Sequence, residues 1–185
     1  MLKVGDKAPT FQERPIFGYD VDVGGITADK PLAICFLQHS NSPLARRAAA
    51  ELQEAYREFD LADIDLAAVI PTSLRVARDF VPRFHLLFRV VADPDRKLFE
   101  QYGVGEAGSR DSLKNLKPSL LVETARHLQQ GFGPDALSFE GTQRQLPAQF
   151  VIAPGGALAY VNYGSSITDS LDVEAILNAG RACRA

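Results

Sequence analysis

The chain has 185 residues, of which 46% are hydrophobic and 23% charged, and its formal net charge at neutral pH is −3. This length favours a single domain over residues 1–185 that buries roughly 70% of the surface exposed by the unfolded chain. The acidic balance and the lack of a long basic block argue against nucleic acid as a partner. The longest apolar runs have the length of a strand, which argues against a membrane span.

The chain contains few residues that bind metals or form disulfides. Two cysteines, Cys35 and Cys183, are too few for a disulfide framework, which favours a cytoplasmic protein. The N-terminal residues contain no apolar run typical of a secretory signal, although a mature exported form stays open. His39, His85 and His127 show no metal-ligand spacing, so we expect no metal site and no cofactor.

The first hundred residues predict strands that alternate with helices. Residues 1–30 are rich in Gly, Pro and Asp and predict an irregular arm with a small hairpin. Apolar runs bounded by turn residues predict strands at Leu32–Leu37, Ile64–Ile70 and Leu87–Val91. Helices are predicted at Pro43–Phe59, from Thr72 or Ser73 to about Phe84, and in a short segment that ends at Gly103.

The second part of the chain is less regular. A helix is predicted at Pro118–Gln130, and a hairpin is predicted from Ala148–Ile152 and Ala157–Tyr163, followed by a last helix at Leu171–Ala179. The order of elements predicts an α/β fold with a central mixed, mainly parallel sheet and helices on both faces. One strand of the hairpin is expected to run antiparallel at the edge side of the sheet.

The strand at Leu32–Leu37 passes through a short polar turn directly into the helix at Pro43–Phe59. Ser42 is the predicted N-cap and Pro43 the first helical residue, a combination typical of a helix start. Such a helix start favours negative charge, because backbone N–H groups and the helix dipole point at it. The candidate functional site is therefore placed at this turn.

Four segments match the pattern of one protein family in the order in which they occur. They are Val4–Phe11, the turn around Ser42-Pro43, Ala92–Val104 and Leu146–Gly156. On these segments the chain resembles the peroxiredoxins of the alkyl hydroperoxide reductase and thiol-specific antioxidant superfamily, a redoxin family. The resemblance implies a thioredoxin-like fold, thiol-dependent peroxide reduction as the family reaction, and a homodimer.

The residues at the family's reactive positions depart from the family pattern. The resemblance places the peroxidatic cysteine of the family at Ala45, and the Thr, Ser or second Cys that lies three residues earlier at Ser42. The family arginine that helps to activate the thiolate aligns with Pro147, which fits instead the cis-proline position of thioredoxins, where extended peptides bind. Arg144 lies three residues upstream. The resemblance therefore implies a family member without the reactive thiol.

These departures favour a binding or regulatory domain with a degenerate active site. Its cleft lies between the helix N-terminus and Pro147, and its expected occupant is a peptide or a small anion. The residues assigned to this cleft are His39, Asn41, Ser42, Pro43, Ala45, Arg144 and Pro147.

Two enzyme hypotheses stay open beside this one. A thiol-dependent peroxidase would use Cys35 or Cys183, although Cys35 in mid-strand is typical of an inert core residue and Cys183 lies in a terminal tail. A hydrolase-like site would pair Ser42 with His39, whereas a plain N-cap explains Ser42 without a catalytic base.

Other polar residues near these segments have structural interpretations. Asp93-Pro94-Asp95 indicates a turn and a helix cap rather than a pair of acid–base carboxylates. Gly155-Gly156 is typical of a turn. Arg46 and Arg47 follow in the first turn of the helix and are expected on the solvated surface.

Overall fold

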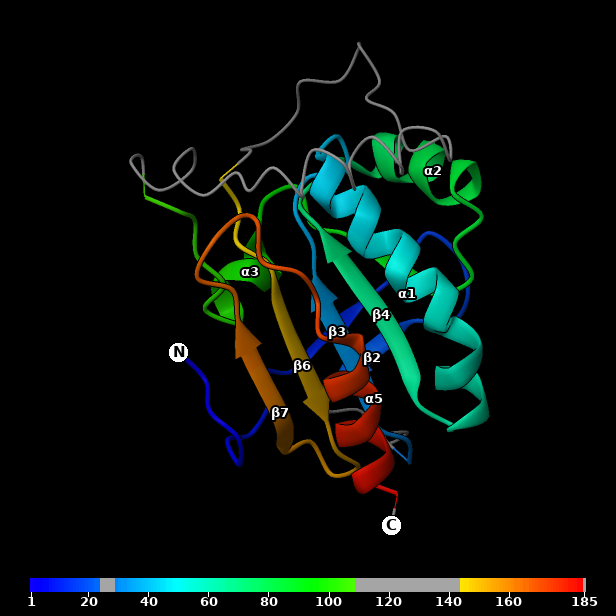
Figure 1. The fold of residues 1–185 in the computed structure, drawn as a ribbon, viewed down its shortest axis with the longest axis vertical. Helices are drawn as coiled ribbons and strands as arrows, with labels where there is room; N and C mark the ends of the chain where they lie inside the picture. The colour runs from blue at the N-terminus through cyan, green and yellow to red at the C-terminus, as the bar shows by residue number, and fades with distance from the viewer. Residues whose placement is uncertain (24–28, 109–143, 185) are drawn as a thin grey trace.

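A five-stranded sheet forms the centre of the computed structural model, which describes residues 1–23, 29–108 and 144–184 (Figure 1). The strand order is β5-β4-β3-β6-β7. Strands β3, β4 and β5 are parallel, and β6 runs antiparallel to both β3 and β7. The strands are β3 (Leu32–Phe36), β4 (Asp65–Ile70), β5 (Arg89–Ala92), β6 (Ala148–Ile152) and β7 (Leu158–Tyr163). The predicted α/β class with a mixed, mainly parallel sheet is confirmed.

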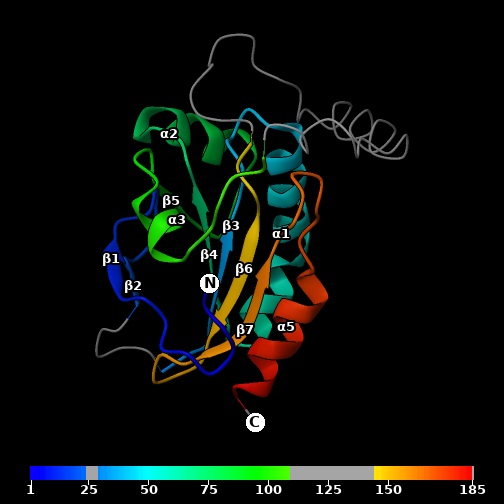
Figure 2. The same ribbon diagram turned by 90° about the vertical axis from the view of Figure 1, so that its left-hand side faces the viewer.

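The two faces of the sheet are covered by different elements. Figure 2 shows α1 and α5 on one side and the β1–β2 hairpin with α3 on the other. Residues of α2 pack in the same hydrophobic core as those of α1 and α5. The elements are α1 (Pro43–Leu61), α2 (Leu74–Arg83), α3 (Lys97–Gln101), α5 (Val173–Ala182), β1 (Phe11–Glu13) and β2 (Val21–Val23). Helices therefore lie on both faces, as predicted.

Strand β3 is buried on both faces because it lies in the middle of this sandwich. Ala33 and Cys35 belong to the core under α1 and α5, whereas Ile34 and Phe36 belong to the core under α3 and the hairpin. Successive side chains of a strand alternate between faces, so a strand buried on both reads as a continuous apolar run. The apolar run at β3 therefore indicates a strand in the middle of the fold and does not indicate a functional site.

An aromatic cluster fills the core on the α3 side. The ring centroids of Phe36 and Phe99 are 5.0 Å apart, and those of Tyr102 and Phe150 are 5.1 Å apart, both in edge-to-face geometry. Phe36 and Phe150 meet across the β3–β6 pair at 5.6 Å. Such pairs add about 0.5–1.5 kcal/mol each beyond their burial, so this cluster fixes α3 against the sheet.

Some predicted boundaries differ from the structure. Helix α1 continues to Leu61, and the strand predicted at Leu87–Val91 begins only at Arg89. Leu87 is exposed, and its N–H donates to the Gln53 side chain instead of to a neighbouring strand. The hairpin expected in the N-terminal arm is present as β1 and β2. The predicted helix at Pro118–Gln130 lies outside the described residues.

The antiparallel strand of the sheet is β6, which lies second from the edge, whereas β7 is the edge strand.

Across residues 1–23, 29–108 and 144–184, no helix combines the length and the apolar character needed to cross a bilayer.

Candidate functional site

The N-terminus of α1 is held by a chain of three hydrogen bonds. The Ser42 hydroxyl caps the helix by accepting the Leu44 N–H at 3.2 Å. The same hydroxyl donates to the side-chain oxygen of Gln38 at 2.7 Å, and the Gln38 amide donates to the Ile167 carbonyl at 2.6 Å. The hydroxyl thus connects the helix start to the loop of residues 164–172, and its proton is committed to Gln38.

His39 lies in the β3–α1 connection but does not act on Ser42. Its side chain is buried, and its Nδ1 accepts the Asn41 N–H at 3.2 Å. A nucleophilic serine needs its proton to be taken by a base, and here that proton points at an amide oxygen. The geometry favours the capping interpretation of Ser42 over the hydrolase-like one.

A small hollow lies beside Ala45, between α1 and the loop that precedes α5. Its volume is about 10 Å³, which is near the lower limit for one water molecule. The residues that line it are Gln38, Leu44, Ala45, Ala48, Pro147, Asp169 and Leu171. Of the residues assigned to the cleft from the sequence, Ala45 and Pro147 meet here, whereas His39, Asn41, Ser42, Pro43 and Arg144 are not part of its lining.

Gly164 packs closely against Pro147. The Gly164 N–H donates to the Pro147 carbonyl at 2.8 Å, and a Cβ at position 164 would lie 2.8 Å from the proline ring. Glycine is needed at 164 because of this close approach. The described residues contain no cis peptide bond, so the cis-proline expectation for Leu146–Pro147 is wrong.

The hydrogen-bonding capacity at the start of α1 is largely used within the fold. The Leu44 N–H is bound by Ser42 and the Arg46 N–H by the Ser42 carbonyl, while Pro43 has no N–H. The carboxylate of Asp169, which also lines the hollow, accepts two backbone N–H groups from residues 165–166 and fixes that loop. A second negative charge beside this carboxylate is disfavoured.

Arg46 is buried, and the expectation that it lies on the solvated surface is wrong. Its Nε donates to the Ser40 carbonyl at 2.9 Å, and its guanidinium lies 5.8 Å from the centroid of the Phe84 ring. The side chain therefore braces the turn between β3 and α1 against the end of α2. Arg47 is half-buried and pairs with Glu51 at 2.7 Å.

Arg144 does not line the hollow. Its Nε and Nη2 donate to the Ala107 carbonyl at 2.8 Å and 2.6 Å. Asp93 has a structural role, as predicted: its carboxylate accepts the N–H groups of Lys97 at 2.9 Å and Leu98 at 2.8 Å at the start of α3. These bonds confirm the interpretation of the Asp93-Pro94-Asp95 turn as a helix cap.

Neither thiol has the environment of a reactive one. Cys35 has no exposed surface, and burial raises the pKa of its thiol to about 12. Cys183 is the half-buried C-cap residue of α5, and burial also raises the pKa of its thiol. Both cysteines are free. Because the thiolate is the nucleophile, both groups are in their unreactive form at neutral pH.

Several residues of the hollow carry no signal in the sequence. Asp169 and Leu171 lie more than a hundred residues after Ala45 and approach it only because β6 pairs with β3. Gln38 lies just after an apolar strand, where a buried amide resembles any other turn residue. These residues show no metal-ligand spacing, so only the tertiary fold identifies them. The described residues contain no cluster suited to a metal ion.

A mixed sheet of this strand order with a helix start beside β3 is typical of thioredoxin-like redoxins. The sequence pattern of the AhpC/TSA family matches residues 4–161, which is most of the chain. The chain belongs to the AhpC/TSA family, as its resemblance to peroxiredoxins predicted. No curated protein sequence matches it.

Solved structures of peroxiredoxins share this fold. Peroxidoxin BcpB from Mycobacterium tuberculosis superposes with a TM-score of 0.70 at 15% identity over 100% of both chains. A peroxiredoxin-like protein from Aquifex aeolicus gives 0.68 at 20% identity, over 98% of this chain and 88% of that one. Reduced 2-Cys peroxiredoxin from Plasmodium vivax gives 0.66 at 14% identity, over 98% and 96%. At these identities the likeness establishes the fold, and the thioredoxin-like prediction is confirmed.

The raised pKa of Cys35 predicts a loss of stability at alkaline pH. The unfolded chain releases the thiol proton near the ordinary cysteine pKa of 9.0, whereas the folded chain keeps it until about pH 12. The stabilisation of the folded state by the protonated Cys35 thiol is therefore complete below pH 9 and is lost as the pH rises from there toward 12. Relative to Cys35→Ala, the wild-type free energy of unfolding should fall by about 1.4 kcal/mol between pH 8 and pH 10.

Urea unfolding of both proteins at several pH values measures this difference. Cys183 is present in both proteins and cancels. A difference in free energy between wild type and variant that stays constant from pH 8 to pH 10 would show that the Cys35 thiol is not buried as described.

Proposed function

We propose that this member of the AhpC/TSA family lacks thiol peroxidase activity and acts as a binding or regulatory domain. Ala45 carries the proposal. It occupies the first turn of α1, where the family resemblance places the peroxidatic cysteine, and its methyl group offers no nucleophile. The family hydroxyl at Ser42 is a helix cap tied to Gln38.

The two remaining cysteines do not substitute for the missing thiol. Cys35 belongs to the core beneath α1 and α5, so peroxide would reach it only if the sheet opened. Cys183 lies at the far end of α5 from Ser42, and burial raises the pKa of its thiol. The neighbouring Arg181 and Arg184 pair with Glu58 and Asp63. This supports the binding hypothesis over the thiol-dependent peroxidase that uses Cys35 or Cys183.

The charges and the volume of the hollow limit the kinds of ligand that we expect at the cleft. The Asp169 carboxylate and the occupied N–H groups at the start of α1 disfavour a small anion. The hollow has too little volume to enclose a ligand. We therefore favour a peptide that lies on the rim of the hollow and places an apolar side chain against Leu44 and the exposed Pro43. A homodimer and a cytoplasmic location stay predictions.

The native protein should react with peroxide no faster than an ordinary free thiol. We expect stopped-flow mixing with hydrogen peroxide and with an alkyl hydroperoxide, followed by mass spectrometry, to show only slow oxidation of Cys35 and Cys183. As a control, protein unfolded in urea should lose its Cys35 thiol faster than native protein, because unfolding exposes it. Rapid oxidation of one cysteine in native protein, abolished by its replacement with serine, would establish the peroxidase instead.

A cysteine placed at position 45 should become more acidic than one placed a turn later. Ala45 and Ala48 both line the hollow, but only Ala45 lies in the first turn of α1. The dipole effect of about 0.3–1 kcal/mol predicts a thiolate fraction roughly two- to five-fold larger in Ala45→Cys than in Ala48→Cys. The pH dependence of iodoacetamide labelling, in a Cys35→Ala/Cys183→Ala background, measures both pKa values.

Equal pKa values in the two variants would mean that the start of α1 gives a thiol at position 45 no net electrostatic advantage over one at position 48. The structure would then give no reason to equate it with the family's thiol position.

Peptide binding at the rim is tested by amide chemical shifts in ¹H–¹⁵N NMR spectra. Titration with a blocked Gly-Gly-Leu-Gly-Gly peptide should shift the amides of Asn41, Leu44 and Ala45, and Leu44→Lys should abolish these shifts. The matched control is Leu61→Lys, at the exposed far end of the same helix. Sodium phosphate should leave the same amides unchanged. Amide shifts with phosphate and none with the peptide would indicate that the ligand is a small anion and not a peptide.

A further inference from the structure

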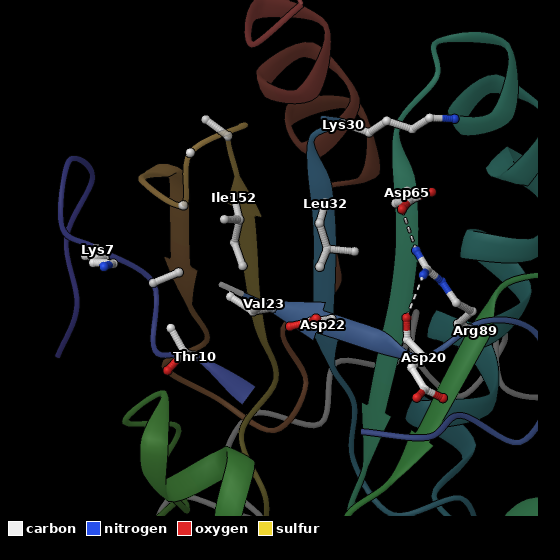
Figure 3. A pocket seen from close by; sticks show the side chains of 14 residues that line it. Lys7, Thr10, Asp20, Asp22, Val23, Lys30, Leu32, Asp65, Arg89 and Ile152 are labelled. Atoms are coloured by element: carbon white, nitrogen blue, oxygen red, sulfur yellow. Dashed lines mark hydrogen bonds and ion pairs between the residues drawn. The ribbon is translucent and has the colours of Figure 1, made fainter. Parts of the chain in front are cut away.

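A pocket lies at the opposite end of the sheet from Ala45. It has a volume of about 200 Å³ and lies at the amino ends of β3 and β4, beside the β1–β2 hairpin (Figure 3). Its lining includes residues of the N-terminal arm, of β2 and of the turn between β6 and β7. Nothing in the proposed function uses this pocket, and no residue of it lines the hollow at Ala45.

The floor of the pocket is aliphatic. Val23, Leu32 and Ile152 come from three different strands, and Figure 3 shows them side by side across the floor. Val23 and Ile152 are almost fully buried, as is Ala8 of the N-terminal arm. The volume lies below the roughly 300–1,000 Å³ of pockets that hold drug-sized ligands. An aliphatic floor of this size therefore favours an occupant with a small apolar body.

One side of the pocket carries charged groups that already have partners. The Arg89 guanidinium pairs with the Asp65 carboxylate at 2.9 Å. Lys30 pairs with Asp63, and Figure 3 shows its side chain directed away from the floor. Asp22, at the middle of the pocket, also has an interaction partner. These groups hold the wall of the pocket together, and none of them is needed to bind a ligand.

The other side of the pocket carries one charged side chain, that of Lys7. This side is formed by residues of the arm and of the β6–β7 turn: Lys7, Ala8, Thr10, Ala153, Gly155 and Gly156. Neither the Lys7 ammonium nor the Thr10 hydroxyl bonds to a residue that the structure describes. Figure 3 shows both on the opposite side of the floor from Asp20 and Arg89. An ammonium and a hydroxyl donor beside an apolar floor complement a carboxylate that carries an alkyl chain.

We propose that this pocket binds a short aliphatic monocarboxylate. The ligand carboxylate accepts hydrogen bonds from the Lys7 ammonium and the Thr10 hydroxyl, and its alkyl chain packs on Val23 and Ile152. Lys7 supplies a single positive charge, which balances one negative charge and leaves the second charge of a phosphate monoester without a partner. The carboxylates on the other side of the pocket repel such a dianion more strongly than a carboxylate.

The probes that test the proposal share one carbon skeleton and differ in the charge of the head group. They are 4-methylpentanoate, which is negative, 4-methylpentanamide, which is neutral, and 4-methylpentylamine, which is positive. ¹H–¹⁵N NMR titration of the full chain with 4-methylpentanoate should give saturable shifts at the amides of Val23, Leu32 and Ile152. The other two probes should each bind at least about ten-fold more weakly, because the charge-assisted contact with Lys7 is lost.

Variants of two lysines in the arm test the charged end of the ligand. Lys7→Met should lower the affinity for 4-methylpentanoate at least about ten-fold, to the affinity of wild type for the neutral amide, because both pairs lack the charged contact. Lys7→Arg keeps the positive charge and should retain most of the affinity. Lys3→Met is the matched control, because Lys3 is an exposed lysine of the same arm outside the pocket. It should bind 4-methylpentanoate as wild type does.

Four results would overturn the proposal. They are the absence of a saturable shift with 4-methylpentanoate up to about 20 mM, binding of the amide or the amine as tight as that of the carboxylate, equal effects of Lys7→Met and Lys3→Met, and shifts centred on Ser42 and Ala45. Since the pocket and the hollow share no residue, failure here would leave the peroxide and peptide experiments unaffected.

Discussion

The pairing of β3 with β4 on one side and with β6 on the other is the constraint on which both candidate sites depend. Strand β3 runs parallel to β4 and antiparallel to β6, so that Cys35 lies opposite Ala68 on one side and opposite Gln149 on the other. A slip by one residue would exchange the two faces and expel Cys35 from the core under α1. The buried, protonated thiol is therefore a consequence of register. The same pairing positions Ser42 beyond one end of β3. At the other end it places Leu32 in a pocket at the amino ends of β3 and β4, beside the β1–β2 hairpin, called the distant pocket below.

The connection from β3 to α1 shows how a family site becomes part of the fold. Gln38, Ser42 and the Ile167 carbonyl form a continuous chain of hydrogen bonds from the strand end to the loop before α5. Each such bond adds about 1 kcal/mol to stability, and a buried partner left unsatisfied would cost more. Arg46 supports the same turn from the other side through Ser40. Polar groups that are saturated in this way stabilise the turn and are poorly placed to change partners during a reaction.

The parts of the fold that were predictable from the sequence are those with local causes. Ser42 and Pro43 mark the start of α1 through capping chemistry, and the run of apolar residues at β3 follows from burial on both faces. Leu87 fits the strand pattern because its side chain is apolar, but its N–H donates to the Gln53 side chain of a helix distant in sequence and not to a neighbouring strand. The burial of Arg46 has a tertiary cause, since an arginine in a first helical turn is usually exposed and contacts with Ser40 and Phe84 hold this one inside.

The two candidate sites were also unequally visible in the sequence. Ala45 was found through the family pattern, but its neighbours Asp169 and Leu171 reach it through the sheet. The sequence does not indicate the pocket at the opposite end of the sheet, because half of its lining comes from residues 7–30, which read as an irregular arm. In the structure this arm is pinned: Gly5 and Asp6 bond both backbone groups of Leu158, and Ala8 donates to Gly156.

The pinned arm gives the distant pocket a wall that exists before any ligand arrives. The arm runs beside β7 and places Lys7 opposite Ala157, while the Arg89–Asp65 pair fixes the other wall. A preformed pocket avoids most of the entropic cost of ordering side chains on binding. At the start of α1 the polar groups are satisfied internally, whereas the pocket at the opposite end of the sheet is lined by both aliphatic and charged side chains. The polar groups at the start of α1 therefore stabilise the fold, and the walls of the pocket at the opposite end are fixed by the same sheet.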